Sequence, residues 1–200
     1  MSRFLSVPLD HTAMHLAVDM QALFAEATPW AVPWLPRVLP NVLAIAERHA
    51  ARTIFTRFVP PASPDEAAGA WRGYYEHWRD MTRERLDPQL LELVEPLRLL
   101  VPPARVIDKG VYSAFGHPGL APGLRRRGIA TLVVTGGETD VCVMATVIAA
   151  VDLGFRVVLP TDALCSGHDP THDALVRLYR ERFSQQIETC TTAEVLEAWR

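Results

Sequence analysis

Three chemically capable side chains stand where apolar segments of this chain end. Asp19 closes the run 16–18, Lys109 closes the segment 105–109, and Cys142 follows the glycine pair at 136–137. A thiol can act as a nucleophile, a carboxylate as its base and an ammonium as a partner for developing negative charge. Together these residue types predict nucleophilic attack on a carbonyl carbon.

Cys142 falls in the first turn of a helix predicted over 141–153. Free backbone N–H groups and the positive end of the helix dipole favour an anion at that place. We therefore predict a lowered thiol pKa and N–H groups that can hold an oxyanion. The alternative is that Cys142 is a small buried hydrophobic residue, as many isolated cysteines are.

Lys109 is the only lysine of the chain, and arginine supplies every other basic side chain. A compact ammonium with a tunable pKa favours a chemical role, although a solvated lysine is the alternative. Asp19 follows an apolar run, where a carboxylate is costly unless it is paired. It could take the proton of a thiol and return it to a leaving amine; the alternative is a carboxylate that caps the next turn.

The hydrophobic pattern predicts one α/β domain over residues 1–200, with six strands that alternate with helices. The unit at 130–160 runs strand, glycine turn, helix, glycine, strand, which is typical of a parallel βαβ crossover. We expect a doubly wound, mostly parallel six-stranded sheet in a three-layer α/β/α sandwich. Ligands bind such sheets at the carboxyl ends of the strands. The predicted strands are 14–19, 53–58, 105–109, 130–135, 155–160 and 185–187.

Composition excludes several classes of function. The 200 residues are 49% hydrophobic with a net charge of −3, so we expect no nucleic-acid partner. No apolar run approaches the roughly 20 residues of a membrane-spanning helix. The polar N-terminus lacks a signal-peptide pattern, which predicts a cytoplasmic protein. Three separated cysteines predict neither a disulfide framework nor a zinc cluster.

Three sequence motifs occur in the order found in a known family. They are 135–146 (TGGETDVCVMAT), 18–21 (VDMQ), and 108–109 (DK) followed by 112–115 (YSAF). The chain resembles the isochorismatase-like cysteine hydrolase superfamily on these motifs, and the resemblance extends over about 14–190.

This resemblance implies a catalytic triad of Asp19, Lys109 and Cys142. It also implies a cis peptide between Gly137 and Glu138, which would aim the N–H groups of Glu138 and Cys142 at an oxyanion. Members of the family often form dimers or tetramers, so we expect a homodimer or homotetramer that acts on a small molecule.

The resemblance favours one branch of the family. Nicotinamidases carry an Asp-x-His metal motif after the second strand, whereas this chain has 56–58 (TRF) there. We expect no metal and no cofactor; for His168 and His172, capping and packing are the simpler interpretation. Isochorismatases proper cleave a vinyl ether without a thiol, so Cys142 favours the metal-free amidohydrolases. The expected reaction cleaves an amide, carbamoyl or ureido C–N bond through a thioester.

Substrate contacts are predicted from residues near the motifs. Arg57 could bind a substrate carboxylate, with a surface ion pair as the alternative. The aromatic segment 71–78 could cover the pocket or pack between subunits, and we favour the subunit contact. The predicted pocket residues are Gln21, Phe24, Arg57, Tyr112 and Phe115.

Two other functions use the same fold. Cys142 could be a redox or peroxide-reactive centre, with Cys165 as the thiol that approaches it in space. The chain could also be a non-catalytic assembly module. A dinucleotide site is disfavoured because the glycine pair at 136–137 lacks the third glycine of that motif.

Overall fold

Short apolar runs form the strands of one sheet in the computed structural model, which describes residues 5–199. All strand pairs are parallel, in the order β3-β2-β1-β4-β5-β7, and β6 pairs with the end of β4. The predicted count of six strands was one short, because β6 has two residues and is too brief to show a hydrophobic period. The strands are β1 (Ala13–Val18), β2 (Thr53–Phe58), β3 (Arg105–Lys109), β4 (Thr131–Gly137), β5 (Arg156–Pro160), β6 (Leu164–Cys165) and β7 (Ile187–Cys190).

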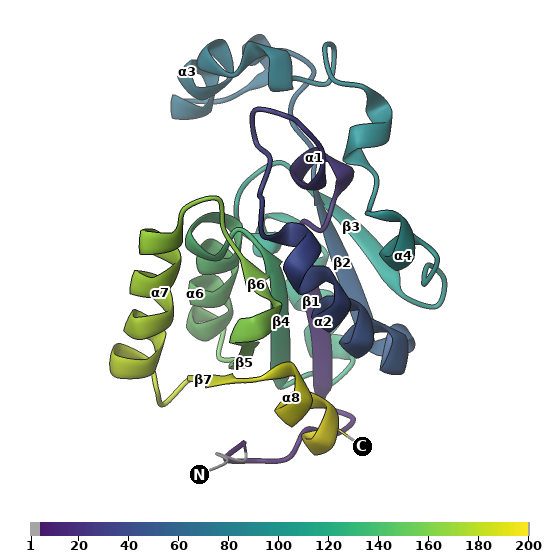
Figure 1. Ribbon diagram of the computed structural model, residues 1–200, viewed down its shortest axis with the longest axis vertical. Coiled ribbons are helices and arrows are strands. Elements are labelled where there is room, and N and C mark those ends of the chain that lie inside the picture. The colour runs from purple at the N-terminus through teal and green to yellow at the C-terminus, as the bar shows by residue number, and fades with distance from the viewer. Residues whose placement is uncertain (1–4, 200) are drawn as a thin grey trace.

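Helices cover both faces of the sheet, which confirms the predicted three-layer α/β/α arrangement (Figure 1). Helices α2, α4 and α8 pack on one face, and α5, α6 and α7 pack on the other. Within residues 5–199, no helix is both long and apolar enough to cross a membrane. The helices are α1 (Ala22–Ala25), α2 (Leu35–Arg48), α3 (Ala70–His77), α4 (Glu95–Arg98), α5 (Leu120–Arg126), α6 (Met144–Asp152), α7 (Asp169–Arg182) and α8 (Thr192–Ala198).

The apolar character of β1 follows from its central position. Successive side chains of a strand point to opposite faces, so a strand covered on both faces is mostly apolar, and its one polar side chain, His15, pairs with the hydroxyls of Thr53 and Thr135. Met14, Leu16 and Val18 join the core beneath α5 to α7, whereas Ala13 and Ala17 face the other helix layer. All six residues of β1 are buried.

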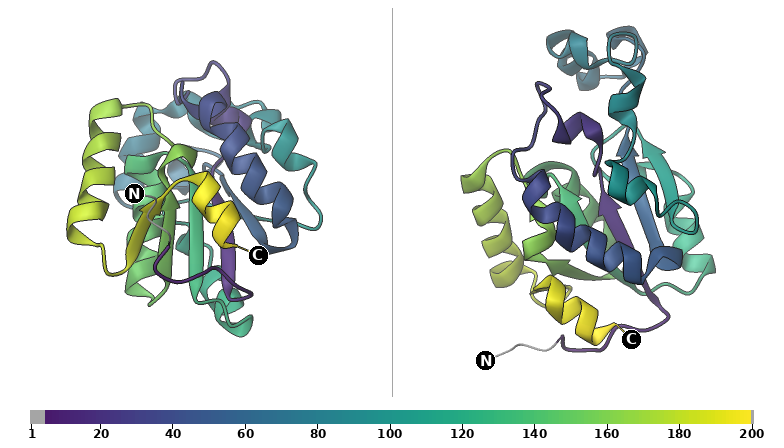
Figure 2. Two further views of the ribbon diagram at one scale, coloured as in Figure 1. Left: turned by 60° about the horizontal axis from the view of Figure 1, so that its bottom comes forward. Right: turned by 45° about the vertical axis from the view of Figure 1, so that its right-hand side comes forward.

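The parallel topology brings the carboxyl ends of β1, β2, β3 and β4 to one edge of the sheet. Helices α1 and α3 lie beyond this edge (Figures 1 and 2). At the opposite end, Leu9 pairs with Trp199, so the two terminal segments lie side by side. The edge beneath α1 and α3 is therefore where a site built from strand ends must form.

Candidate active site

Asp19, Lys109 and Cys142 meet at this edge in a buried cluster. Asp19 follows β1, Lys109 ends β3, and Cys142 lies in the π-helical turn Thr139–Val143 between β4 and α6. Their exposed fractions are 1%, 3% and 6%. Lys109 Nζ is 2.7 Å from Asp19 Oδ2, and both side chains lie close enough to Cys142 to affect the pKa of its thiol. The structure thus brings together the three residues that sequence singled out.

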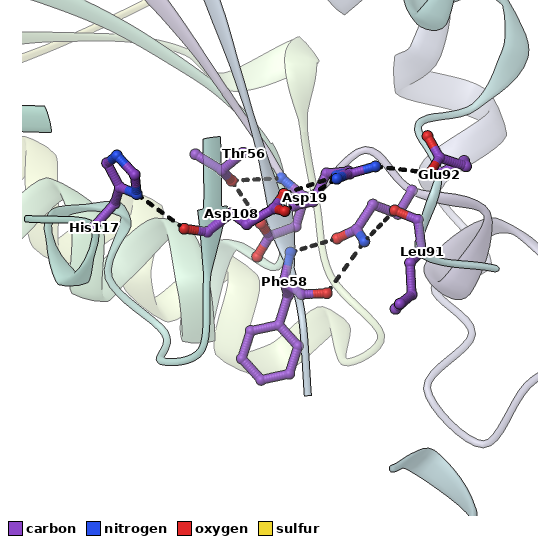
Figure 3. Close-up of polar contacts among 9 residues, drawn as sticks. Asp19, Thr56, Phe58, Leu91, Glu92, Asp108 and His117 are labelled. Carbon is purple, nitrogen blue, oxygen red and sulfur yellow. Dashed lines mark hydrogen bonds and ion pairs between the residues drawn. The ribbon is translucent and has the colours of Figure 1, made fainter. Parts of the chain in front are cut away.

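Thr56 of β2 orients the Asp19 carboxylate. Its hydroxyl donates to Asp19 Oδ1 at 2.5 Å and accepts from the Asp19 backbone N–H at 3.1 Å (Figure 3). Asp19 has φ = 51°, in the left-handed region that few non-glycine residues adopt. Thr56 thereby holds one carboxylate oxygen and leaves the other for Lys109. Sequence reasoning missed this role, because a threonine inside a strand is ordinary.

Lys109 is held in its charged form. Its Nζ donates to the carbonyl of Val111 at 3.1 Å and lies 4.9 Å from the centre of the Phe58 ring. Burial by itself would lower the pKa of Lys109, but attraction to Asp19, to which a thiolate at Cys142 would add, outweighs it, and the pKa is raised. The cluster therefore contains a permanent buried cation.

The Cys142 thiol has a raised pKa, and the predicted lowering was wrong. Burial is the largest cause, the negative charge of Asp19 adds to it, and the positive charge of Lys109 only partly opposes them. Removal from water disfavours the charged thiolate. The resting nucleophile is a neutral thiol that lies beside Asp19.

The turn that carries Cys142 depends on a close approach of β4 to β1. Gly136 has φ = 102°, and a Cβ there would lie 2.1 Å from the Val18 carbonyl oxygen, so only glycine fits. The Gly137–Glu138 peptide is cis, as the family resemblance implied. The role of the Glu138 and Cys142 N–H groups as an oxyanion hole stays a prediction.

A cavity of about 410 Å³ opens onto Cys142. Most of its wall is aromatic or aliphatic, and its titratable side chains are a carboxylate, an imidazole, two tyrosine phenols and the Cys142 thiol. This composition suits a small, flat organic molecule. The lining residues are Phe24, Pro29, Trp30, Ala31, Phe58, Tyr74, Tyr112, Glu138, Val141, Cys142, Gly167 and His168.

Of the predicted pocket residues, Phe24 and Tyr112 line the cavity, but Gln21 does not. The Gln21 amide accepts from the Phe58 N–H at 2.7 Å and donates to the carbonyls of Phe58 and Leu91 at 3.2 and 2.8 Å (Figure 3). Gln21 joins β2 to the segment before α4 and lies outside the cavity wall, so its contact with substrate stays a prediction.

Arg57 and Phe115 also lie outside the cavity wall. Arg57 makes a two-pronged contact with Asp108 at 2.8 and 3.0 Å and a third bond to Glu92 at 2.8 Å (Figure 3). These two carboxylates occupy its guanidinium, so the ion-pair alternative is confirmed, and the structure does not place Arg57 in the cavity wall. Phe115 stacks on Phe155 with ring centres 6.0 Å apart and belongs to the core.

The aromatic segment 71–78 covers the cavity from α3. Tyr74 lines the cavity. The ring centres of Trp71 and Tyr112 are 4.8 Å apart, and those of Trp78 and Trp30 are 6.1 Å apart. Within this chain only Tyr74 of the segment contributes to the cavity wall, and the favoured subunit contact stays a prediction. Sequence reasoning missed Trp30, which stands among prolines in a segment without periodicity.

The two histidines near α7 make local polar contacts. His168 Nδ1 lies 3.0 Å from Thr171 Oγ1, and His172 Nδ1 lies 2.9 Å from Thr139 Oγ1. In the part of the chain that the structure describes, no three His, Cys, Asp or Glu side chains are grouped to hold a metal ion. Metal independence stays a prediction from the sequence motif at 56–58.

Comparisons with known proteins agree on one family. A family model described as "Isochorismatase domain" matches residues 13–194. The chain is similar to a maleamate amidohydrolase of Pseudomonas putida, with 29% identity over 72% of this chain and 71% of that protein. It is also similar to Nicotinamidase 3 of Arabidopsis thaliana, with 27% identity over 84% of this chain and 80% of that protein. A cysteine hydrolase structure from Pseudomonas syringae pv. phaseolicola has the same fold, with a TM-score of 0.82 and 23% identity over 98% of this chain and 97% of that chain.

Proposed function

The chain belongs to the isochorismatase family, and we propose that it is a cysteine hydrolase that cleaves an amide-type C–N bond of a small molecule. The observation that carries this proposal is the buried cluster of Asp19, Lys109 and Cys142, whose Cys142 lines an aromatic cavity. Two relatives named as a maleamate amidohydrolase and a nicotinamidase support the same reaction class. The bond is that of an amide, carbamoyl or ureido group.

In the first step, the thiol of Cys142 attacks the carbonyl carbon. Because burial raises the pKa of this thiol, its proton passes to Asp19 as the C–S bond forms. The carbonyl π electrons move onto oxygen, and the N–H groups of Glu138 and Cys142 hold the oxyanion. The Lys109 ammonium is 2.7 Å from Asp19, where it stabilises the Asp19 carboxylate before the proton transfer and the nearby oxyanion after it.

In the second step, Asp19 gives the proton to the departing nitrogen, the C–N bond breaks and a thioester remains. Water then attacks the thioester while Asp19 takes one of its protons. The C–S bond breaks, the acid leaves, and the proton returns to the Cys142 sulfur. The net change is one water consumed for one C–N bond cleaved.

Ammonia release from a panel of primary amides and ureido acids tests the proposal. Wild type is compared with Cys142→Ala and with Cys190→Ala, a matched loss of a buried thiol in β7. We expect Cys142→Ala to lose at least about a thousandfold in rate and Cys190→Ala to keep its activity. Release that persists in Cys142→Ala would overturn the proposal.

The redox alternative is less well supported. Peroxide-reactive cysteines need an accessible thiolate. Burial raises the pKa of Cys142 and raises that of Cys165 to about 12. Measurement of peroxide consumption by wild type separates the two functions.

A cytoplasmic location and a homodimer or homotetramer are also part of the proposal, and light scattering of the purified protein tests the assembly.

A further inference from the structure

The cavity beside Cys142 has an asymmetric distribution of charge. Among residues 5–199, its lining contains one carboxylate, Glu138, and no lysine or arginine. The nearest strand-end cations are already engaged, since Lys109 pairs with Asp19 and Arg57 pairs with Asp108 and Glu92. An anionic substrate would therefore meet a negative wall with no free cation to bind it.

Glu138 is positioned to accept a cation. Its Oε1 accepts the Gly167 N–H at 3.0 Å, and within residues 5–199 its Oε2 has no hydrogen-bond partner. Burial is the main cause of the raised pKa of this carboxyl, and repulsion by Asp140 adds to it. A positive group in the cavity would offset both the lost hydration and this repulsion.

The aromatic walls favour the same kind of ligand. The ring centre of Trp30 lies 5.9 Å from that of Phe58 and 6.0 Å from that of Tyr74. Tyr112 also lines the cavity. Ring faces attract cations, most strongly where water is partly excluded. A flat group that carries positive charge would therefore contact both the rings and the Glu138 carboxylate.

We propose that this cavity selects amides that carry a positively charged group, such as an ammonium or amidinium, and that Glu138 determines this specificity. The statement about turnover rests on the proposed amide hydrolysis, whereas the preference in binding does not. Amides that carry a carboxylate are poor ligands, because Glu138 repels them and no lining side chain compensates.

Three benzamides of nearly equal shape test the charge preference. They carry a para amidinium (4-amidinobenzamide), a neutral para carboxamide (terephthalamide) or a para carboxylate (terephthalamate). Binding is measured by calorimetry with the Cys142→Ala variant, and turnover by ammonia release with wild type. The buffer is held at about pH 8, where histidine side chains are ordinarily neutral.

Each measurement is repeated with Glu138→Gln, which keeps the side chain's size and removes its charge. Glu76→Gln is the matched control, since Glu76 is exposed on α3 and does not line the cavity. We expect the amidinium probe to bind about tenfold more tightly than the neutral probe, and the carboxylate probe to bind least. In Glu138→Gln the dissociation constants of the three probes should lie within about threefold of each other. Glu76→Gln should keep the order of affinity found without either substitution.

The outcomes separate this inference from the proposed reaction. Preference for the amidinium probe without hydrolysis of any probe would support the charge inference while the tested amides fail as substrates. Hydrolysis that depends on Cys142 but ignores probe charge would overturn the inference and leave the proposed function standing. Equal binding, no binding by any probe, or an unchanged order in Glu138→Gln would also overturn it.

Discussion

Replacement of Lys109 by methionine removes the buried cation and keeps most of the side-chain volume. Asp19 would then stay in a site that is 1% exposed, with Thr56 as its remaining polar side-chain contact. At the 2.7 Å separation of the pair, the attraction is about 6 kcal/mol for an effective dielectric constant of about 20. Desolvation of both groups offsets much of this attraction.

Loss of one partner of a buried pair typically costs about 3–5 kcal/mol, because the other charge stays buried and uncompensated. For a chain of this size, about 2–4 °C in Tm corresponds to 1 kcal/mol. We therefore expect Lys109→Met to lower Tm by about 6–20 °C. The double variant Asp19→Asn/Lys109→Met carries neither charge. Its free energy of unfolding should exceed that of Lys109→Met by at least about 2 kcal/mol.

Urea unfolding gives the free energy of unfolding of both variants, and thermal unfolding gives their Tm. Both are followed by tryptophan fluorescence at about pH 7. Arg105→Met is the control, since Arg105 is an exposed cation on the same strand and its loss should change stability by less than about 0.5 kcal/mol. A free energy of unfolding of Lys109→Met within about 1 kcal/mol of wild type would show that the buried pair is not what stabilises Asp19. A double variant no more stable than Lys109→Met would show the same.

Three further predictions follow from contacts elsewhere in the structure. Burial lowers the pKa of His15 to about 3, so between about pH 6.5 and 3 the unfolded chain binds a proton that the folded chain does not. Acidification should therefore reduce stability by up to about 1.4 kcal/mol per pH unit, and His15→Gln should flatten this slope in urea titrations; an equal slope in both proteins would contradict it. Arg57→Ala should lower stability by about 1 kcal/mol, because its ion pairs are partly solvated, and should change KM less than twofold in steady-state assays. A large rise in KM would restore Arg57 as a substrate contact. Iodoacetamide at about pH 7 should alkylate Cys142 more slowly than it alkylates free cysteine, because burial raises its pKa; faster labelling, read by peptide mass spectrometry, would show a thiolate at rest.

The fold could be predicted largely from sequence because burial on both faces of the sheet leaves a direct pattern. Strands such as β1 and β4 are buried throughout, so most of their residues are apolar and the runs end at a charge or at glycine. Parallel pairing then places the carboxyl ends together, which is why Asp19, Lys109 and Cys142 could be assigned to one site. The two-residue β6 escaped prediction because it is shorter than any hydrophobic period.

The cavity could be predicted only in part. Phe24 and Tyr112 lie close to the motifs and do line it, but its remaining aromatic wall joins Trp30 to Tyr74, far apart in sequence. Arg57 could not be distinguished from a substrate-binding arginine, because the carboxylates that occupy it come from other segments of the chain. Such contacts arise from packing between distant segments, about which local periodicity carries no information.

Sequence by itself determined the order of the strands along the chain, the helix layers and the identity of the three clustered residues. Only the tertiary structure decided the raised pKa values of Lys109 and Cys142, the orientation of Asp19 by Thr56 and the negative wall at Glu138. The reason is that a pKa depends on the total loss of hydration and on every neighbouring charge. A turn position contributes one part of that balance, and burial contributed the larger part at Cys142.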